Sequence, residues 1–305
     1  MTTVDAPAKP KTDSFWPRSF TAVVLGTWVY VGCVYWLPAM VALLAAAAIT
    51  LAFEIVRAHS NPPTSVELTK GDNSVAIAVA GFLVLSHIGI PLLFSNRHPL
   101  VVYIVELLLF VLTLGYIQIE IASPATTDHF WLVLRAGWMA LPLAWLITLL
   151  LLPNGSSYLF DYAALIVSSD VGGYICGRTI RKVPLPEFLL WLKAKPAKYL
   201  SPNKTIFGFM GAMVLGPAVT ATIFVRTGQP YQSWLIALAI LLGILGQAGD
   251  LYMSSLKRAF GIKDFAKKIF GILPGMGGIG DRVDSVLLTA PVWCFVIIFS
   301  PLVIT

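Results

Sequence analysis

Residues 20–56 read FTAVVLGTWVYVGCVYWLPAMVALLAAAAITLAFEIV. This stretch is almost continuously apolar, and it is about twice as long as the roughly 20 apolar residues with which an α-helix crosses a bilayer. Pro38 stands near its middle, where a proline breaks a helix because it lacks the backbone N–H. The stretch therefore predicts a tight hairpin of two membrane-spanning helices, near 20–36 and 39–57.

The same apolar pattern continues through the rest of the chain. Seven further apolar runs follow, at 75–95, 99–122, 130–152, 158–176, 206–226, 233–253 and 284–304. Of the 305 residues, 57% are hydrophobic and 12% are charged, whereas a soluble domain carries about 25% charged residues. We therefore predict an all-α integral membrane protein with about nine transmembrane helices.

The basic residues predict how these helices are oriented, because positively charged loops stay on the cytoplasmic side of a membrane. With nine spans and a cytoplasmic N-terminus, 18 of the 21 Lys and Arg residues lie in inner loops. Two others, Arg97 and Arg226, lie in outer loops. This asymmetry places the C-terminus outside, and it accounts for the net charge of +6 without nucleic acid as a partner.

The spans also divide the chain. Residues 1–19 are polar and contain Pro and Lys, so we expect a disordered cytoplasmic tail. Residues 20–152 are expected to form a membrane region of five helices. Residues 153–305 are expected to form a catalytic membrane domain with two long cytoplasmic loops, 177–205 and 254–283, which hold 13 of the basic residues.

Some site chemistries are excluded by missing patterns. The three cysteines, Cys33, Cys176 and Cys294, all lie in apolar runs, so the sequence has neither a disulfide framework nor a CxxC metal site. The patterns HExxH and GxxxxGK[ST] are absent too, so zinc hydrolysis and P-loop chemistry have no support in the sequence.

Polar groups gather where the eighth predicted span reaches the cytoplasm. Asp250, Ser254 and Lys257 are spaced i, i+4 and i+7, which places a carboxylate, a hydroxyl and an ammonium group on one helix face. An ionisable group near the bilayer is costly, and it indicates a functional site. Asp281 and Asp284 share a face at the start of the ninth span.

These aspartates predict a metal site. Mg²⁺ prefers carboxylate oxygens and usually completes its shell with waters and substrate phosphates. Three aspartates that converge from two helix ends, with Lys257, Arg258 and Lys263 nearby, suit a metal-bound triphosphate. The pattern indicates transfer at phosphorus by positioning and charge neutralisation.

Two other segments are candidates for phosphate binding, and a third carries a further polar helix face. Gly275-x-Gly277-x-x-Gly280 matches GxGxxG, but no strand precedes it, so a dinucleotide fold is excluded while its backbone amides can still cradle phosphate. Lys204 and Thr205 stand at the start of a span, where a helix N-terminus favours anions. A further face, at the inner end of the sixth span, is made by Asp170, Tyr174 and Arg178.

Together these segments resemble the phosphatidate cytidylyltransferases, also called CDP-diacylglycerol synthases. SLKRAFGIKD at 255–264 and PGMGGIGDRVD at 274–284 look like the signature of that family. SDVGGYICGR at 169–178 and SPNKT at 201–205 are similar to its two other polar blocks. This chain differs from the family pattern at Met276, where the family has His, and at Phe207, where it has an acid.

The resemblance implies a multi-span enzyme of the cell (inner) membrane, commonly a homodimer, with its active site facing the cytoplasm. It would join CTP to phosphatidate among the membrane lipids, giving CDP-diacylglycerol and pyrophosphate with Mg²⁺ and, as an open alternative, a second cation. The implied catalytic residues are Asp250, Asp281, Lys257 and Arg282. The implied metal ligands are Asp250, Asp281, Asp284 and Asp170. The implied substrate-binding residues are Lys204, Ser201, Thr205, Arg178, Ser254, Arg258, Lys263, Gly277 and Gly278.

Two other functions stay open. A CTP-dependent enzyme that acts on another lipid phosphate or a polyprenol would use similar groups, and its product would distinguish it. A transporter would have broken helices in two repeated halves, and the sequence shows no internal repeat. Acids inside the predicted spans are expected to be solvated or hydrogen-bonded rather than to form an ion path; they are Glu54, Glu106, Glu120 and Asp161.

Overall fold

The fold is taken from a computed structural model, and every regular element in its described part is helical. The described residues are 27, 30–32, 35–59, 70–94, 104–105, 107–109, 111–112, 129–199, 201, 204–227, 233–262, 265 and 278–299. The α-helices whose two ends lie in this part are α2 (Leu37–His59), α3 (Lys70–Phe94), α5 (His129–Leu151), α6 (Gly155–Lys182), α7 (Ile206–Thr227), α8 (Ser233–Ala259) and α9 (Val286–Phe299). A short 3₁₀ helix, η1 (Glu187–Lys193), lies between α6 and α7.

Seven of the predicted spans correspond to these seven α-helices. Among the described residues, five helical segments are long and apolar enough to cross a membrane: Leu37–Ala58, Leu134–Leu151, Gly155–Lys182, Ile206–Ile223 and Trp234–Ala259. The spans expected at 20–36 and 99–122 fall largely outside the described residues, so the count of nine stays a prediction, as does the orientation of the termini.

The helix break predicted at Pro38 lies where α2 begins. The helix starts at Leu37, so Pro38 lies in its first turn, where the missing N–H has no acceptor to lose.

Two helices run further than their hydropathy predicts. α6 continues to Lys182 and α8 to Ala259, and each has two basic residues in its last turn, which interact favourably with the C-terminal end of the helix dipole. The predicted loops 177–205 and 254–283 therefore begin as helix.

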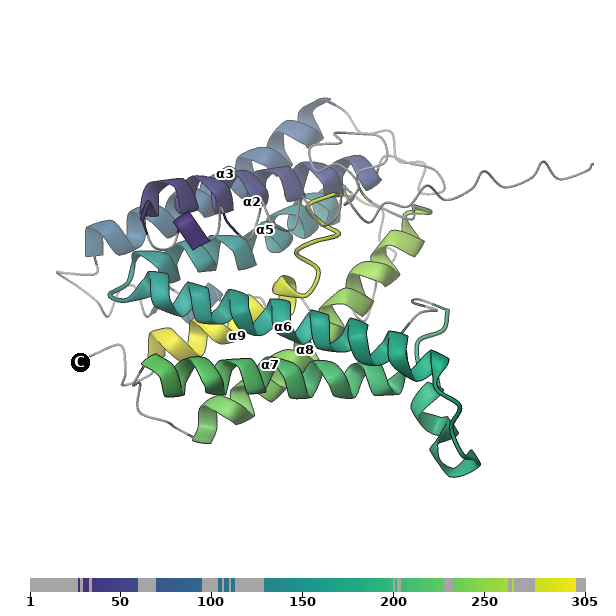
Figure 1. The fold of residues 1–305 in the computed structure, drawn as a ribbon. Coiled ribbons are helices and arrows are strands. Elements are labelled where there is room, and N and C mark those ends of the chain that lie inside the picture. Colours follow the sequence, from purple (N-terminus) through teal and green to yellow (C-terminus); the bar gives the residue numbers. More distant parts are fainter. Residues whose placement is uncertain are drawn as a thin grey trace, which may run out of the picture.

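The helices form two groups that meet at α5 and α9 (Figure 1). α2, α3 and α5 pack against one another, while α6 packs along α7, and α8 contacts both α7 and α9. α5 is the most enclosed span, because 89% of its 18-residue apolar stretch is buried, against 33% of the corresponding stretches of α6 and α7. Its side chains Met139, Trp145 and Ile147 form the centre of the hydrophobic core.

Glycines let α6 and α7 approach each other closely. A Cβ on Gly172 would lie 2.5 Å from the carbonyl oxygen of Gly211, and a Cβ on Gly211 would lie 2.5 Å from the sulfur of Cys176. Small residues at such a crossing allow backbones to pack directly on each other. Ser169 adds a hydrogen bond across the same contact, with its Oγ 2.8 Å from the carbonyl oxygen of Ala212. This contact fixes α6, which carries Asp170, against the start of α7.

Candidate active site

The ends of four helices surround one cavity of about 500 Å³. The C-terminal halves of α6 and α8, the segment leading into α7 and the turn before α9 all contribute to its wall. The lining residues are Asp170, Gly173, Tyr174, Gly177, Arg181, Ser201, Lys204, Thr205, Gly208, Phe209, Gln247, Asp250, Asp281, Arg282 and Asp284. Polar blocks that lie up to about a hundred residues apart in the sequence therefore meet in one place.

The first ion pair of the cavity joins the start of α7 to α8. Lys204 Nζ lies 2.6 Å from Asp250 Oδ2, and it also donates to the carbonyl oxygen of Gln247 at 3.3 Å. The ammonium group lies 5.5 Å from the centre of the Phe209 ring, within the range of a cation–π contact. The side chain of Asp250 keeps 34% of its surface exposed, so this carboxylate faces the cavity.

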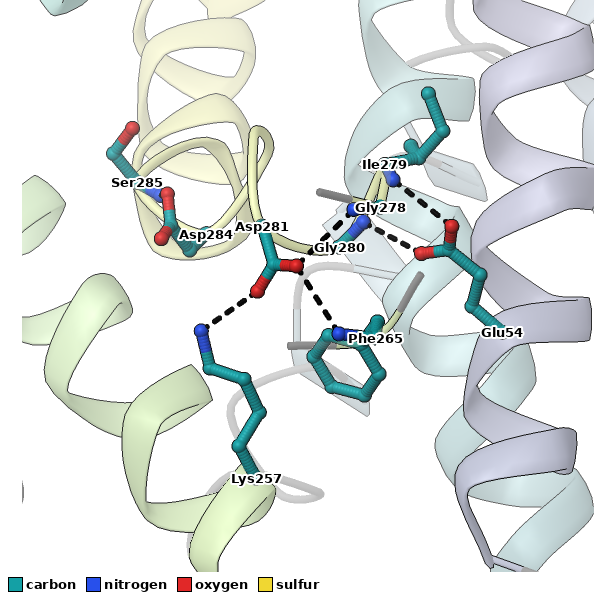
Figure 2. Close-up of polar contacts among 9 residues, drawn as sticks. All are labelled: Glu54, Lys257, Phe265, Gly278, Ile279, Gly280, Asp281, Asp284 and Ser285. Carbon is teal, nitrogen blue, oxygen red and sulfur yellow. Dashed lines mark hydrogen bonds and ion pairs between the residues drawn. The ribbon is translucent and has the colours of Figure 1, made fainter. Parts of the chain in front are cut away.

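The second ion pair joins α8 to the turn before α9 (Figure 2). Lys257 Nζ donates to Asp281 Oδ1 at 2.8 Å. Asp281 Oδ2 accepts the backbone N–H groups of Phe265 and Gly278, each at 3.1 Å. Only 13% of the Lys257 side chain and 10% of the Asp281 side chain are exposed, so this pair is more enclosed than the first.

The other two aspartates meet through Ser285. Asp284 Oδ1 accepts the backbone N–H of Ser285 at 2.9 Å, and Ser285 Oγ donates to Asp170 Oδ2 at 3.3 Å. Burial, followed by the charge of Asp250, raises the pKa of Asp284 to about 7. A cation bound among these carboxylates would favour their charged forms and act in the opposite direction.

The structure brings eight of the predicted site residues to the cavity wall: Asp170, Ser201, Lys204, Thr205, Asp250, Asp281, Arg282 and Asp284. Thr205 is 1% exposed, and its Oγ1 accepts the N–H of Gly208 at 3.2 Å, so this hydroxyl caps the first turn of α7. Lys257 does not line the cavity itself, but its ammonium group contacts the lining residue Asp281.

The remaining predicted residues lie elsewhere. Arg178 is exposed and donates to the Tyr174 hydroxyl at 2.7 Å. Ser254 is buried and Arg258 is exposed, and neither lines the cavity. Gly278 does not line the cavity, but its N–H donates to the lining residue Asp281. Lys263 and Gly277 lie outside the described residues.

Arg181 lines the cavity and was not predicted from the sequence, although the helix period contained the signal. Asp170, Tyr174, Gly177 and Arg181 are spaced i, i+4, i+7 and i+11, which is three turns along one face. Arg178, the predicted member of that face, is at i+8 and contacts Tyr174 without lining the cavity. Gln247 was missed as well, and it stands one turn before Asp250 on α8.

Glu54 on α2 also reaches the site. It was expected to be solvated or hydrogen-bonded, and it is hydrogen-bonded: its carboxylate accepts the backbone N–H groups of Ile279 and Gly280 in the turn that carries Asp281. Its link to this turn had no signal in the sequence, because the two segments are 225 residues apart.

Comparisons with known proteins support one family. The family model described as "Cytidylyltransferase family" matches residues 16–300. The phosphatidate cytidylyltransferase of Bacillus subtilis is 39% identical over 147 residues, which is 47% of this chain and 48% of the relative. The enzyme of the same name from Mycobacterium bovis is 36% identical over 160 residues, 52% of this chain and 47% of the relative. The matched part thus spans about half the length of these curated relatives.

Proposed function

Because the chain belongs to the cytidylyltransferase family, we propose that it joins CTP to phosphatidate and forms CDP-diacylglycerol and pyrophosphate. The relatives that share 36–39% identity with it are named for that reaction. The single observation that carries the proposal is the cavity in which four aspartates, two of them paired with lysines, face one another. Such a site can bind a polyphosphate together with a cation.

The reaction depends on how the two substrates are positioned more than on proton transfer. An oxygen of the phosphatidate phosphate attacks the α-phosphorus of CTP, the bond between the α-phosphorus and the bridging oxygen breaks, and pyrophosphate leaves with that oxygen. A phosphate oxygen is already a competent nucleophile, so no strong general base is required. Basic groups aimed at the phosphates stabilise the charge that develops in the transition state. Lys204, Lys257 and Arg282 supply such groups here.

The two ion pairs give these lysines a definite role. In the structure each lysine is neutralised by an aspartate, Lys204 by Asp250 and Lys257 by Asp281. We propose that the phosphates of bound CTP replace the aspartates as the ion-pair partners of the two lysines. The carboxylates are then available to bind a cation. The site would then exchange one set of ion pairs for another without burying an uncompensated charge.

The acidic residues fit Mg²⁺ as the cation. Within the described ranges, no three His, Cys, Asp or Glu side chains lie close enough together to hold a metal ion by themselves. Mg²⁺ suits such a site, because it is usually bound by one or two carboxylates and completes its octahedron with waters and substrate phosphates. One or two of the carboxylates of Asp250, Asp281, Asp284 and Asp170 would hold it. When bound, Mg²⁺ neutralises the phosphates of CTP.

We further propose that the cavity faces the cytoplasm at the cell (inner) membrane and that the protein is a homodimer. The first point is supported by the concentration of Lys and Arg in the segments around the cavity. It is also supported by the bacterial origin of the relatives. The dimer is supported by the family resemblance, and cross-linking in native membranes tests it.

The test is the identity of the lipid product. Purified protein is incubated with labelled CTP, phosphatidate and Mg²⁺, and a CDP-lipid with one equivalent of pyrophosphate is expected. Asp250→Asn and Asp281→Asn should each lower turnover by about 100-fold or more, because each removes a charge that the transition state requires. Near-normal turnover in both variants would refute the assignment, and a phosphorylated lipid with CDP would show a kinase instead.

A further inference from the structure

The turn before α9 rests on a carboxylate from the opposite half of the chain. Glu54 Oε1 accepts the N–H of Ile279 at 3.0 Å, and Glu54 Oε2 accepts the N–H of Gly280 at 2.8 Å (Figure 2). Glu54 is 5% exposed. Both carboxylate oxygens are thus used on consecutive backbone N–H groups, an arrangement of two charge-assisted hydrogen bonds with a defined direction.

The turn is fitted closely against this carboxylate. A Cβ on Gly278 would lie 2.6 Å from Glu54 Oε1 and 2.7 Å from Oε2, so only glycine leaves room for the side chain. A Cβ on Gly280 would lie 3.3 Å from Leu51, which stands one turn before Glu54 on α2. The turn therefore sits on one face of α2.

The same turn orients the enclosed ion pair. The N–H of Asp281 donates to the carbonyl oxygen of Gly278 at 3.2 Å, and the Asp281 carboxylate accepts the N–H of Gly278 and the ammonium of Lys257. Glu54 holds the outer side of the turn while Asp281 closes its inner side. A movement of the turn would carry Asp281, and with it Lys257, away from their present positions.

An apolar side chain at position 54 would be buried on α2 with a smaller loss of solvation free energy. The neighbours Leu51 and Ile55 are apolar and fully buried, and burying a carboxylate is expensive unless it is hydrogen-bonded. The carboxylate does what an apolar group cannot, since it binds two backbone donors and fixes the direction of the turn.

We propose that Glu54 is a positioning residue for the transfer reaction. It fixes the 278–281 turn so that Asp281 and Lys257 stand where the phosphates of CTP are handled. The inference rests on the proposed function for its kinetic consequences. It extends the site to α2, in the first half of the chain.

The test compares Glu54→Gln and Glu54→Ala with Asp161→Asn in the full-length protein. Gln keeps the volume but turns an NH₂ group toward one of the two N–H donors, and Ala removes both acceptors. Asp161 is a matched control, because it is another carboxylate in a membrane-spanning helix and does not line the cavity. We expect both Glu54 variants to lose about 10- to 100-fold in kcat, the usual cost of removing a group that orients a ligating residue. The KM for phosphatidate should stay within about twofold of the wild-type value.

Hydrogen exchange gives a second readout that needs no activity. The segment 278–284 should exchange faster in both Glu54 variants than in the wild-type and Asp161→Asn proteins. Wild-type exchange in this segment, or wild-type kcat in both variants of an active enzyme, would overturn the proposal. A wild-type protein that makes no CDP-lipid refutes the proposed function instead, and the exchange comparison then decides whether Glu54 holds the turn.

Gly278→Ala tests the contact itself. In the wild-type background the new methyl group meets the Glu54 carboxylate, whereas Glu54→Ala removes the three atoms that lie nearest to it. The loss of kcat caused by Gly278→Ala should therefore be at least about fivefold smaller when Glu54→Ala is already present, as contacting residues are non-additive. Strictly additive losses would contradict the contact.

Discussion

The four aspartates of the cavity fall into two kinds. Asp250 and Asp281 each contact a lysine, so their charges are compensated within the protein. Asp284 and Asp170 instead share Ser285 as a hydrogen-bond donor. Burial and the charge of Asp250 raise the pKa of Asp284, which means that its charged form costs folding stability.

Asp284→Asn should therefore stabilise the protein while it abolishes turnover. At pH 8 with a chelator present, we expect a higher thermal midpoint in detergent, equivalent to about 1–3 kcal/mol after allowance for the partial exposure of the carboxylate. The pKa of Asp284 is raised to about 7, so the wild-type group binds a proton as the pH falls to 6 and the difference should shrink. Asp281→Asn is a control that should lower the thermal midpoint, because it removes the charged partner of Lys257. A lower midpoint for Asp284→Asn at pH 8 would contradict this account.

The types of residue in the site could be predicted from the sequence, but the ion pairs that they form could not. The charged groups of Asp250, Asp281 and Lys204 follow from residue chemistry and order along the chain. The match of Lys204 with Asp250, rather than with Asp281, depends on how α7 packs on α8. Ser254 and Arg258 follow Asp250 on α8 at i+4 and i+8, but the α8 residues that line the cavity are Gln247 and Asp250, so the cavity ends at Asp250 on this helix.

The contact between α6 and α7 governs the elements around the site. α6 carries Asp170 and Arg181, and the segment entering α7 carries Lys204. Hydropathy predicted both helices, but their boundaries depend on groups that hydropathy ignores. α6 runs to Lys182 because its last turn is stabilised by basic residues and by packing on α7, although those residues are too polar to count as a span.

Gly172→Ala should separate these two helices. The added methyl would lie 2.5 Å from the carbonyl oxygen of Gly211 and 2.7 Å from Leu215, so a backbone has to move. We expect a loss of about 1–3 kcal/mol, seen as a lower thermal midpoint, together with reduced turnover. Gly81→Ala in α3 is the matched control, since nothing lies within 4 Å of its added Cβ and its midpoint should not fall. Equal midpoints for the two variants would contradict the tight crossing.

For the whole molecule, charge and apolar length predicted the all-helical class and its seven described α-helices. They could not predict which helices are neighbours. α5 contacts α9 and Glu54 contacts the turn before α9, and both depend on long-range packing that has no local pattern. The expected first and fourth spans lie largely outside the described residues and remain predictions.

The orientation of the protein across the membrane can be tested at the two ends of α6. This helix has 28 residues and is about 42 Å long, enough to cross a bilayer. Ser157 near its start and Lys195 beyond its end are both exposed. In a chain whose native cysteines are replaced, Lys195→Cys should react with an impermeant maleimide only from the cytoplasmic side, and Ser157→Cys only from the other side. Labelling of both from one side would refute the proposed topology.

The contact between Glu54 and the turn also sets an order of events during biosynthesis. The ribosome adds about 5–20 residues per second, so the 225 residues between Glu54 and Ile279 correspond to roughly 11–45 s of synthesis. Throughout that interval α2 has already been made, and its carboxylate lacks the two amides that finally bind it. These two hydrogen bonds of α2 can therefore form only after the segment up to Gly280 has been synthesised, long after α3 and α5 have become available to pack on the same helix.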